Sequence, residues 1–167
     1  MITGLYETHI QVSSLERSME FYDGLPGLQM AMVDWSRNIA FFWIGKQGEA
    51  MLGLWENKKP FASQHFAFRS SVDYILNDAV PFLNSMKIEC YNFLKDGTSK
   101  PMVFGWSSTI AIYFRDPDNH ELELIATLPQ SPRPELGIIS YEKWIAATGN
   151  DDPAEPGDNL AGPARRI

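Results

Sequence analysis

Two histidines of the sequence lie at matching positions and could bind a metal ion. His9 lies within a stretch of alternating apolar and polar residues, and His65 lies within a similar stretch 56 residues later. Because successive side chains of a β-strand point to opposite faces, His9 shares a face with Glu7 and Gln11. Two imidazoles that face one cavity suit a borderline divalent ion such as Zn, Mn, Fe(II), Co or Ni. The pair therefore predicts a divalent metal site.

A carboxylate from the last strand pattern, residues 120–126, could complete this site. Glu121 and Glu123 share one face of that strand, and Glu123 is flanked by leucines in a segment otherwise suited to the core. A carboxylate is costly to bury without a cation beside it, which favours Glu123 as the third ligand. Two imidazoles and one carboxylate leave coordination positions for a substrate or water. Because both residues lie next to the predicted turn, we expect Glu121 to be a solvated strand end and His120 to be a turn or surface residue.

The elements that position these residues occur twice in the same order. The first copy is predicted as a strand, a helix and three further strands, at residues 5–12, 15–23, 28–34, 38–44 and 50–56. The second copy is predicted as a strand at 64–69, a helical stretch at 72–87, a strand at 88–93, a loop at 94–107 and strands at 109–115 and 120–126. The fold class is thus α+β, with two β-α-β-β-β units in a barrel-like, pseudo-twofold sheet arrangement.

Local signals mark the ends of these elements. Ser13 and Glu16 have the spacing of a capping box for the first helix. Pro81 interrupts the second helical stretch, so we expect a kink or a restart capped by Asp78. The Asp-Pro-Asp-Asn sequence at 116–119 predicts a hairpin turn in which Asn119 takes the left-handed conformation.

Length and composition indicate one domain with a C-terminal extension. The chain has 167 residues, 44% of them hydrophobic, which is ample for a packed core. We expect one domain over residues 1–129, made of two units at about 1–58 and 59–129, and a partly mobile extension at 130–167. Within the extension, residues 139–147 could form a helix that docks through Ile139 and Trp144. The glycine- and proline-rich end past Thr148 is expected to be mobile.

Charge and cysteine content exclude several classes of protein. The net charge of −7 argues against a general nucleic-acid binder, which needs basic residues to neutralise phosphates. The single cysteine, Cys90, allows no intrachain disulfide and reads as a buried apolar residue rather than a nucleophile. The N-terminus does not resemble a signal peptide, and no apolar run approaches the ~18 to 20 residues of a membrane span. We therefore expect a cytoplasmic protein that binds neither nucleic acid nor membranes.

Two motifs resemble those of a known family. Residues 12–22, with Leu-Pro-Gly-Leu at 25–28, resemble the first helix and loop of the vicinal oxygen chelate superfamily, and residues 113–124 resemble its C-terminal hairpin. That superfamily includes glyoxalase I, fosfomycin-resistance enzymes, bleomycin-resistance proteins and extradiol dioxygenases. The opening residues 1–5 together with His9 are most similar to the fosfomycin-resistance branch. The resemblance covers about residues 1–128.

The resemblance implies a site, a fold and an assembly. It implies His9, His65 and Glu123 as metal ligands, the same three residues that strand alternation indicates. It also implies a barrel-like sheet in each unit and a homodimer whose site can draw ligands from both chains. Tyr113 matches a tyrosine that faces the substrate in the fosfomycin-resistance branch.

The sequence departs from these relatives at three places. Glyoxalase I has a glutamate that serves as fourth ligand and base where this chain has Gly53, so the catalytic base is unassigned. Gln11 replaces a threonine of the fosfomycin-resistance branch, and it could hydrogen-bond a substrate or line the cavity. The segment 95–107 carries Lys100 and Trp106 among apolar residues, which suits an apolar or aromatic substrate better than a small phosphonate.

The leading hypothesis is a divalent-metal-dependent, glyoxalase-like enzyme. The ion would bind two oxygens of a small-molecule substrate and stabilise an oxyanion, in a lyase, isomerase or thiol-transfer reaction. Tyr113, Gln11, Lys100 and Trp106 would bind the substrate. One alternative is an Fe(II) extradiol-type dioxygenase, whose ligand set is the same. The other is a metal-free protein of the bleomycin-resistance type, which sequesters an antibiotic or other ligand in an acidic, tryptophan-lined groove.

Overall fold

The computed structural model describes residues 1–149 of the 167-residue chain. Contacts divide the chain into two compact units. Compact unit 1 comprises Met1–Phe66 with Phe114–Leu122, and compact unit 2 comprises Ala67–Tyr113 with the described residues from Glu123 onward. The expected mobility of the C-terminal end concerns residues 150–167, which lie outside the described residues. No helix among residues 1–149 is long and apolar enough to cross a membrane.

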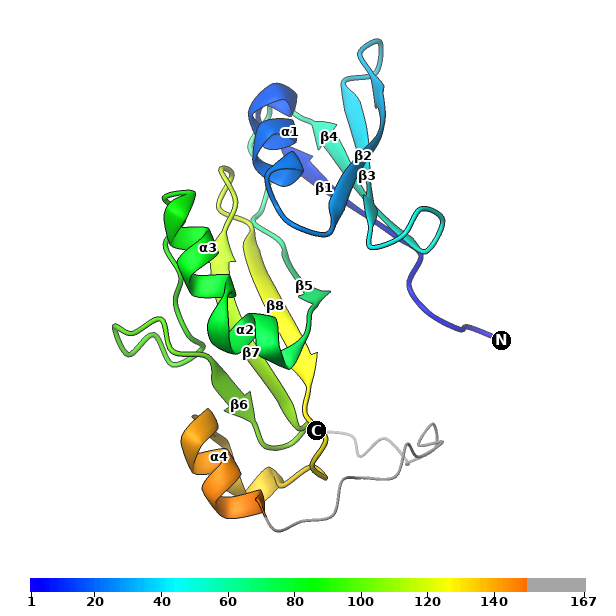
Figure 1. Cartoon of the computed structure of the whole chain (residues 1–167). Coiled ribbons are helices and arrows are strands. Elements are labelled where there is room, and N and C mark those ends of the chain that lie inside the picture. The colour runs from blue at the N-terminus through cyan, green and yellow to red at the C-terminus, as the bar shows by residue number, and fades with distance from the viewer. Residues whose placement is uncertain (150–167) are drawn as a thin grey trace. The chain divides into compact units, whose positions relative to one another are not determined.

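The first sheet has four strands and one helix (Figure 1). Its elements are β1 (Glu7–Val12), α1 (Leu15–Asp23), β2 (Leu28–Asp34), β3 (Ile39–Ile44) and β4 (Ala50–Glu56). The strand order is β1-β4-β3-β2, with β1 parallel to β4 and the other neighbours antiparallel. These bounds agree with the predicted helix and strands to within two residues.

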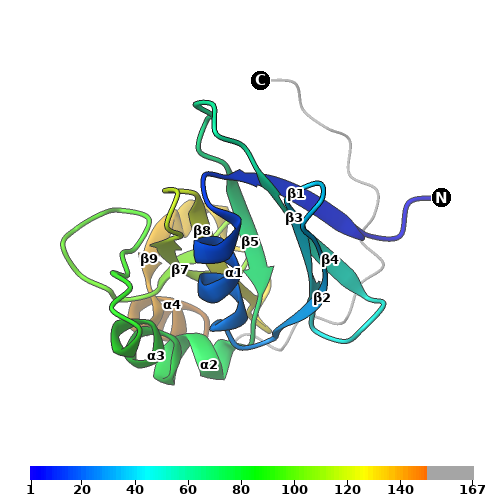
Figure 2. The same ribbon diagram turned by 90° about the horizontal axis from the view of Figure 1, so that it is seen from above.

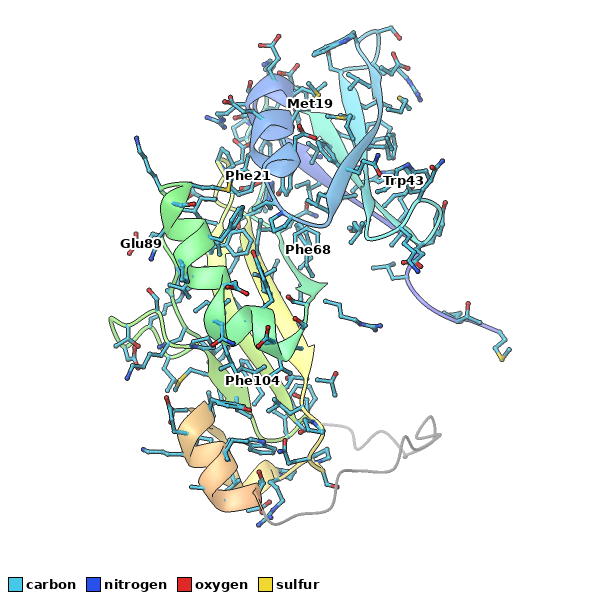
Figure 3. The ribbon with its side chains drawn as sticks, in the orientation of Figure 1. Met19, Phe21, Trp43, Phe68, Glu89 and Phe104 are labelled. Atoms are coloured by element: carbon cyan, nitrogen blue, oxygen red, sulfur yellow. The ribbon has the colours of Figure 1, made fainter. Side chains whose placement is uncertain are left out.

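One face of this sheet is buried under α1, and the other carries His9. Ile10 and Val12 of β1 are buried, and Tyr22 of α1 packs against Phe42 of β3 with ring centroids 6.2 Å apart. Each large apolar side chain buried in this way stabilises the fold by about 1.5–3 kcal/mol. We call the opposite side the open face of the first sheet. Its side chains include Glu7, His9, Gln11, Phe41, Trp43 and Trp55, and Figure 3 shows Trp43 on β3, away from α1.

The start of α1 differs from the prediction by one residue. Ser14, not Ser13, is the N-cap, and its hydroxyl accepts a hydrogen bond from the backbone N–H of Arg17 at 3.4 Å. Ser13 instead donates its backbone N–H and its hydroxyl to the Asp118 carboxylate, at 2.9 and 2.5 Å. The predicted capping box was therefore wrong, because a contact from a distant part of the sequence takes up the Ser13 side chain.

The second sheet has five strands, and three helices follow or separate them. In chain order the elements are β5 (His65–Arg69), α2 (Val72–Asn77), α3 (Ala79–Ser85), β6 (Met102–Phe104), β7 (Thr109–Arg115), β8 (Glu121–Thr127), β9 (Ile138–Ser140) and α4 (Tyr141–Thr148), with a short 3-10 helix at Pro134–Leu136. Figures 1 and 2 both show α2 and α3 on one side of this sheet.

The strand orders confirm the internal repeat. The second sheet has the order β5-β8-β7-β6-β9, whose first four members repeat the order β1-β4-β3-β2. His9 and His65 therefore lie on equivalent strands, β1 and β5. The α+β class is confirmed, and within residues 1–149 each sheet is open rather than closed into a barrel.

The segment between α3 and β7 was predicted incorrectly. Residues 88–93 form no strand; within them only Tyr91 makes a β-bridge, to Tyr113. The Asn92 side chain donates instead to Asp96 at 2.8 Å and to Thr98, and such local bonds compete with a strand ladder. The strand lies later, at Met102–Phe104, within the segment that was expected to be a loop.

The helical stretch restarts at the predicted place. α2 ends at Asn77 and α3 begins at Ala79, with Asp78 between them, although the Asp78 side chain makes no capping bond. Pro81 lies in the first turn of α3, where backbone N–H groups have no partner within the helix, so proline is tolerated there.

The described part of the C-terminal extension joins the second sheet. β9 pairs antiparallel with β6, and α4 follows it directly. The predicted docking helix is confirmed at Tyr141–Thr148, where Trp144 is fully buried and its indole N–H donates to Gln130 at 3.1 Å. Ile139 belongs to β9 rather than to the helix, because pairing with β6 claims its backbone.

Candidate functional site

His9 lies on the open face of the first sheet, as strand alternation predicts. Its side chain is 40% exposed, and its Nε2 is 2.7 Å from Oε1 of Glu7. The imidazole lies 5.3 Å from the Trp55 ring and 5.5 Å, edge to face, from the Phe41 ring. Neighbouring strands thus hold the ring while leaving it accessible.

Gly53 makes this position of the imidazole possible. The parallel pairing of β1 and β4 sets His9 directly opposite Gly53. A β-carbon at residue 53 would lie 2.6 Å from Cδ2 of His9 and 3.0 Å from Cε1 of Phe41. Contacts this short exceed what close packing allows, so a larger residue would force the imidazole to move. The His9 imidazole therefore occupies the space that a glutamate side chain at residue 53 would need.

A pocket of about 470 Å³ adjoins His9 within compact unit 1. Its lining residues come from β1, β4 and the segment that leads to β5: His9, Ile10, Gln11, Trp55, Phe61, Ala62 and Gln64. This volume lies within the range of small-molecule sites, which combine apolar walls with a few polar groups. Gln11 was predicted to bind substrate or line the cavity; it lines this pocket, and its side-chain oxygen accepts from Asn57 at 3.0 Å.

His120 supports the wall of this pocket and is fully buried, so its prediction as a turn or surface residue was wrong. Its Nδ1 accepts from the backbone N–H of Gln64 at 2.9 Å, and its Nε2 donates to the carbonyl of Gln11 at 2.7 Å. The ring also stacks on Phe61, with centroids 5.8 Å apart. With both ring nitrogens engaged, His120 positions the pocket wall. Strand alternation could have predicted this burial, because it places His120 on the same face as Leu122 and opposite to Glu121.

The hairpin turn before His120 is anchored to α1 by two aspartates. Asp118 accepts from Ser13 and, at 2.6 Å, from Arg17. Burial raises its pKa, but these hydrogen bonds and the Arg17 charge outweigh that effect, so the pKa of Asp118 lies below its usual value. Asp116 accepts from the backbone N–H groups of Asp118 and His120, and Asn119 has the predicted left-handed conformation, with φ of 64°.

A second buried pair lies beneath the same turn. The Tyr22 hydroxyl donates to Asp116 at 2.9 Å. Burial is the main cause that raises the pKa of both groups, and the Asp116 charge raises that of Tyr22 further. Both aspartates therefore act as turn formers, as predicted, and also fasten the turn to the helix.

His65 begins β5 and is oriented by the start of β8. Its Nδ1 lies 3.1 Å from the carbonyl oxygen of Glu121 and 3.8 Å from the Glu121 carboxylate. A histidine that donates Nδ1–H to a carbonyl presents Nε2 as its metal-binding nitrogen. This geometry suits the predicted role of His65. Glu121, expected to be a solvated strand end, is partly exposed and also lies beside His65.

Glu123 is a buried carboxylate of compact unit 2, only 5% exposed. On its face of β8, Ile125 packs against a cluster formed by Phe104, Ala111 and Tyr113. A carboxylate is one of the side-chain groups that bind borderline divalent metal ions. Its chemistry thus fits the predicted donor set of two imidazoles and one carboxylate.

The other predicted substrate residues lie in compact unit 2 and do not line the pocket beside His9. Tyr113 is buried and stacks on Tyr91, with centroids 5.9 Å apart. Lys100 is exposed, and Trp106 is 69% exposed. The apolar residues 102–104 of the same segment are buried in the second sheet, so they serve the core rather than a substrate loop.

Cys90 is buried, as predicted, and is not an activated nucleophile. Burial, with a smaller contribution from the Glu89 charge, raises the pKa of its thiol to about 11. The thiol is therefore protonated at neutral pH, which removes its nucleophilic form.

Among residues 1–149, no three His, Cys, Asp or Glu side chains are grouped so that they could hold a metal ion. The individual residues nevertheless have suitable chemistry: His9 is accessible, His65 is oriented by Glu121, and Glu123 is a buried carboxylate.

Comparison with known proteins gives matches among solved structures. No family model matches the sequence, and no curated protein does. An integron cassette protein, HFX_CASS4, from the mobile metagenome of the Halifax Harbour sewage outfall is 29% identical, with a TM-score of 0.62, over 75% of this chain and 99% of that one.

Two further solved structures have named activities. The fosfomycin resistance protein FosX of Listeria monocytogenes, complexed with Mn(II) and sulfate, is 22% identical, with a TM-score of 0.57, over 77% of this chain and 93% of that one. Lactoylglutathione lyase of Agrobacterium tumefaciens is 19% identical, with a TM-score of 0.57, over 75% and 94%. The chain therefore has the fold of the vicinal oxygen chelate superfamily.

Proposed function

We propose that the protein is a divalent-metal-dependent enzyme that acts on a small molecule, with His9, His65 and Glu123 as metal ligands. The observation that carries this proposal is the accessible imidazole of His9 beside a pocket of about 470 Å³. The repeated strand order gives His65 the strand equivalent to that of His9, and its Nδ1 lies 3.1 Å from the Glu121 carbonyl oxygen. FosX, a protein of the same fold, binds Mn(II), which makes manganese a suitable first ion to test.

We further propose that a second copy of the chain completes the site. The resemblance to the vicinal oxygen chelate superfamily supports this arrangement, because sites of that superfamily can draw ligands from both chains of a dimer. A twofold dimer would supply two such sites from identical surfaces.

A bound metal ion would act as a Lewis acid. Two oxygens of the substrate would bind to it, and the ion would stabilise the oxyanion formed in the reaction. Gln11 would orient the substrate by hydrogen bonding. Trp55 and Phe61 would exclude water from the pocket and favour an apolar or aromatic substrate. Tyr113, Lys100 and Trp106 are proposed to contact the remainder of the substrate. A lyase, isomerase or thiol-transfer reaction is consistent with this arrangement.

Calorimetric titration of metal-stripped protein with Mn(II), Zn(II) and Fe(II) tests this proposal. We expect one ion to bind per chain, and His9→Ala, His65→Ala and Glu123→Gln each to abolish high-affinity binding while circular dichroism stays unchanged. The matched control is Glu20→Gln, which removes an exposed carboxylate of α1. Wild-type protein that binds none of these ions would contradict the proposal. A strong preference for Fe(II) would favour the dioxygenase alternative.

A metal-free binding protein is the second candidate, favoured by the aromatic open face of the first sheet. Phe41, Trp43 and Trp55 are all at least partly exposed there. Such a surface, on a chain of net charge −7, suits a cationic aromatic ligand. Tryptophan fluorescence that responds to such ligands equally in wild type and in Glu123→Gln, without metal, would support this candidate instead.

A further inference from the structure

The side chain of Glu7 places a carboxylate directly beside the imidazole of His9. The two residues share the open face of β1, and Oε1 of Glu7 lies 2.7 Å from Nε2 of His9. The side chains are 39% and 40% exposed. Among the residues that the structure describes, Glu7 forms no ion pair with a lysine or arginine.

The neighbouring strand β4 cannot supply a carboxylate at this place. The residue opposite His9 is Gly53, and the imidazole occupies the space that a side chain there would need. On the same face of β4, the residues on either side are Met51 and Trp55, which carry no carboxylate. Any carboxylate beside His9 in this sheet must therefore come from β1, and Glu7 provides it.

The spacing of the two donor atoms suits joint metal binding. Imidazole nitrogen and carboxylate oxygen ligands lie at about 2.0–2.2 Å from a borderline divalent ion, so two adjacent ligands are about 3 Å apart at the right angles of an octahedral site and about 3.4 Å apart in a tetrahedral zinc site. The observed separation of 2.7 Å is closer to the octahedral value. A metal ion could thus take the place of the hydrogen bond, once the imidazole turns its nitrogen lone pair from the carboxylate oxygen toward the ion.

We propose that Glu7 is a further metal ligand, which binds the same ion as His9. This inference rests on the proposed function, since it assumes that His9 binds a metal. It assigns to β1 the carboxylate that Gly53 excludes from β4. A site with Glu7 would have one more anionic donor and one open position fewer than a site of His9, His65 and Glu123 alone.

Titration of metal-stripped full-length protein with Co(II), followed by visible absorption and calorimetry, tests this inference. The variants are Glu7→Gln, Glu7→Asp, His9→Ala and the matched control Glu20→Gln. Glu7→Gln keeps an oxygen that can accept from His9 but loses the anionic ligand. We expect it to weaken Co(II) binding on the order of 10- to 100-fold and to change the absorption bands, with no change in the circular dichroism. Glu7→Asp should restore part of the affinity, and Glu20→Gln should bind as wild type does.

The possible outcomes separate this inference from the proposed function. If Glu7→Gln and Glu7→Asp both bind Co(II) with wild-type affinity and spectrum while His9→Ala does not bind, Glu7 is not a ligand and the proposed function stands. If wild-type protein itself binds no Co(II), Mn(II) or Zn(II), the proposed function fails, and the role of Glu7 fails with it. Should Glu7→Gln fold poorly, the spectrum of Glu7→Asp decides, because a ligand shortened by one methylene must shift the bands.

Discussion

At the scale of single residues, the contact between Gly53 and His9 determines what the open face of the first sheet can hold. A β-carbon at residue 53 would meet the imidazole at 2.6 Å. The imidazole can rotate toward the exposed side, so Gly53→Ala is expected to lower stability by less than about 1–3 kcal/mol, the usual range for overpacking. We expect a larger loss in the free energy of Mn(II) binding, because the substitution moves the His9 imidazole away from Glu7.

Parallel measurements of unfolding free energy and Mn(II) affinity check this expectation. Gly4→Ala is the matched control, since no atom lies within 4 Å of a β-carbon there. Equal Mn(II) affinity of Gly53→Ala and Gly4→Ala would show that the ring position of His9 does not matter for binding.

His120 is the second residue whose removal should have a defined effect. His120→Ala leaves the Gln64 N–H and the Gln11 carbonyl without their partners, at about 1–3 kcal/mol for each buried group. We expect urea unfolding to show a loss of about 2–6 kcal/mol in total. His65→Ala, which removes a half-exposed ring, should cost under about 1 kcal/mol. Similar losses in the two variants would contradict the buried role of His120.

At the scale of elements, Asp118 joins the β7–β8 turn to the start of α1. Its folded-state pKa lies below the unfolded value, so the unfolded chain binds the proton more tightly. The stabilisation is therefore complete above the unfolded pKa and is lost as the pH falls through the folded pKa. We expect the stability difference between wild type and Asp118→Asn to be largest at neutral pH and to shrink under acid conditions.

Denaturant midpoints from neutral pH down into the acid range measure this difference. The exposed Asp23→Asn, at the C-terminal end of α1, is the control for the removal of an aspartate charge elsewhere on the same helix. A difference between wild type and Asp118→Asn that does not change with pH would exclude the proposed linkage.

Most elements could be predicted because their signals are local. Alternation and helical spacing gave α1 and the strands of the first sheet, and Asn119 of the hairpin turn has its expected conformation. The prediction of a strand at 88–93 was wrong, because the Asn92 side chain forms local hydrogen bonds with Asp96 and Thr98. Such a choice between a loop and a ladder depends on partners that alternation does not reveal.

The candidate site was predictable only in part, because its remaining features depend on tertiary contacts. Alternation places Glu7, His9 and Gln11 on one face, as the structure has them. The contact of His9 with Gly53 depends on the register of β1 with β4, and the burial of His120 depends on the segment that carries Phe61. Neither register nor packing between distant segments can be derived from the spacing of residues along the chain.

At the scale of the whole molecule, the proposed metal site draws its ligands from two chains. We expect inactive His9→Ala and inactive Glu123→Ala proteins, mixed in equal amounts, to regain up to about a quarter of the wild-type metal sites if ligands cross between chains and subunits exchange at random. Sites built within one chain would give no recovery. Native mass spectrometry of the mixture verifies exchange, so failure to recover sites after full exchange would exclude a shared site.

The metal content of untagged protein, purified without added metal, tests the central claim most directly. Elemental analysis should find about one equivalent of a transition metal per chain in wild type, and little in Glu123→Ala or His65→Ala purified in the same way. The ion identified would also separate oxygen chemistry from lyase or transferase chemistry. Wild-type protein that contains no metal and keeps the same melting temperature in chelator would contradict the account.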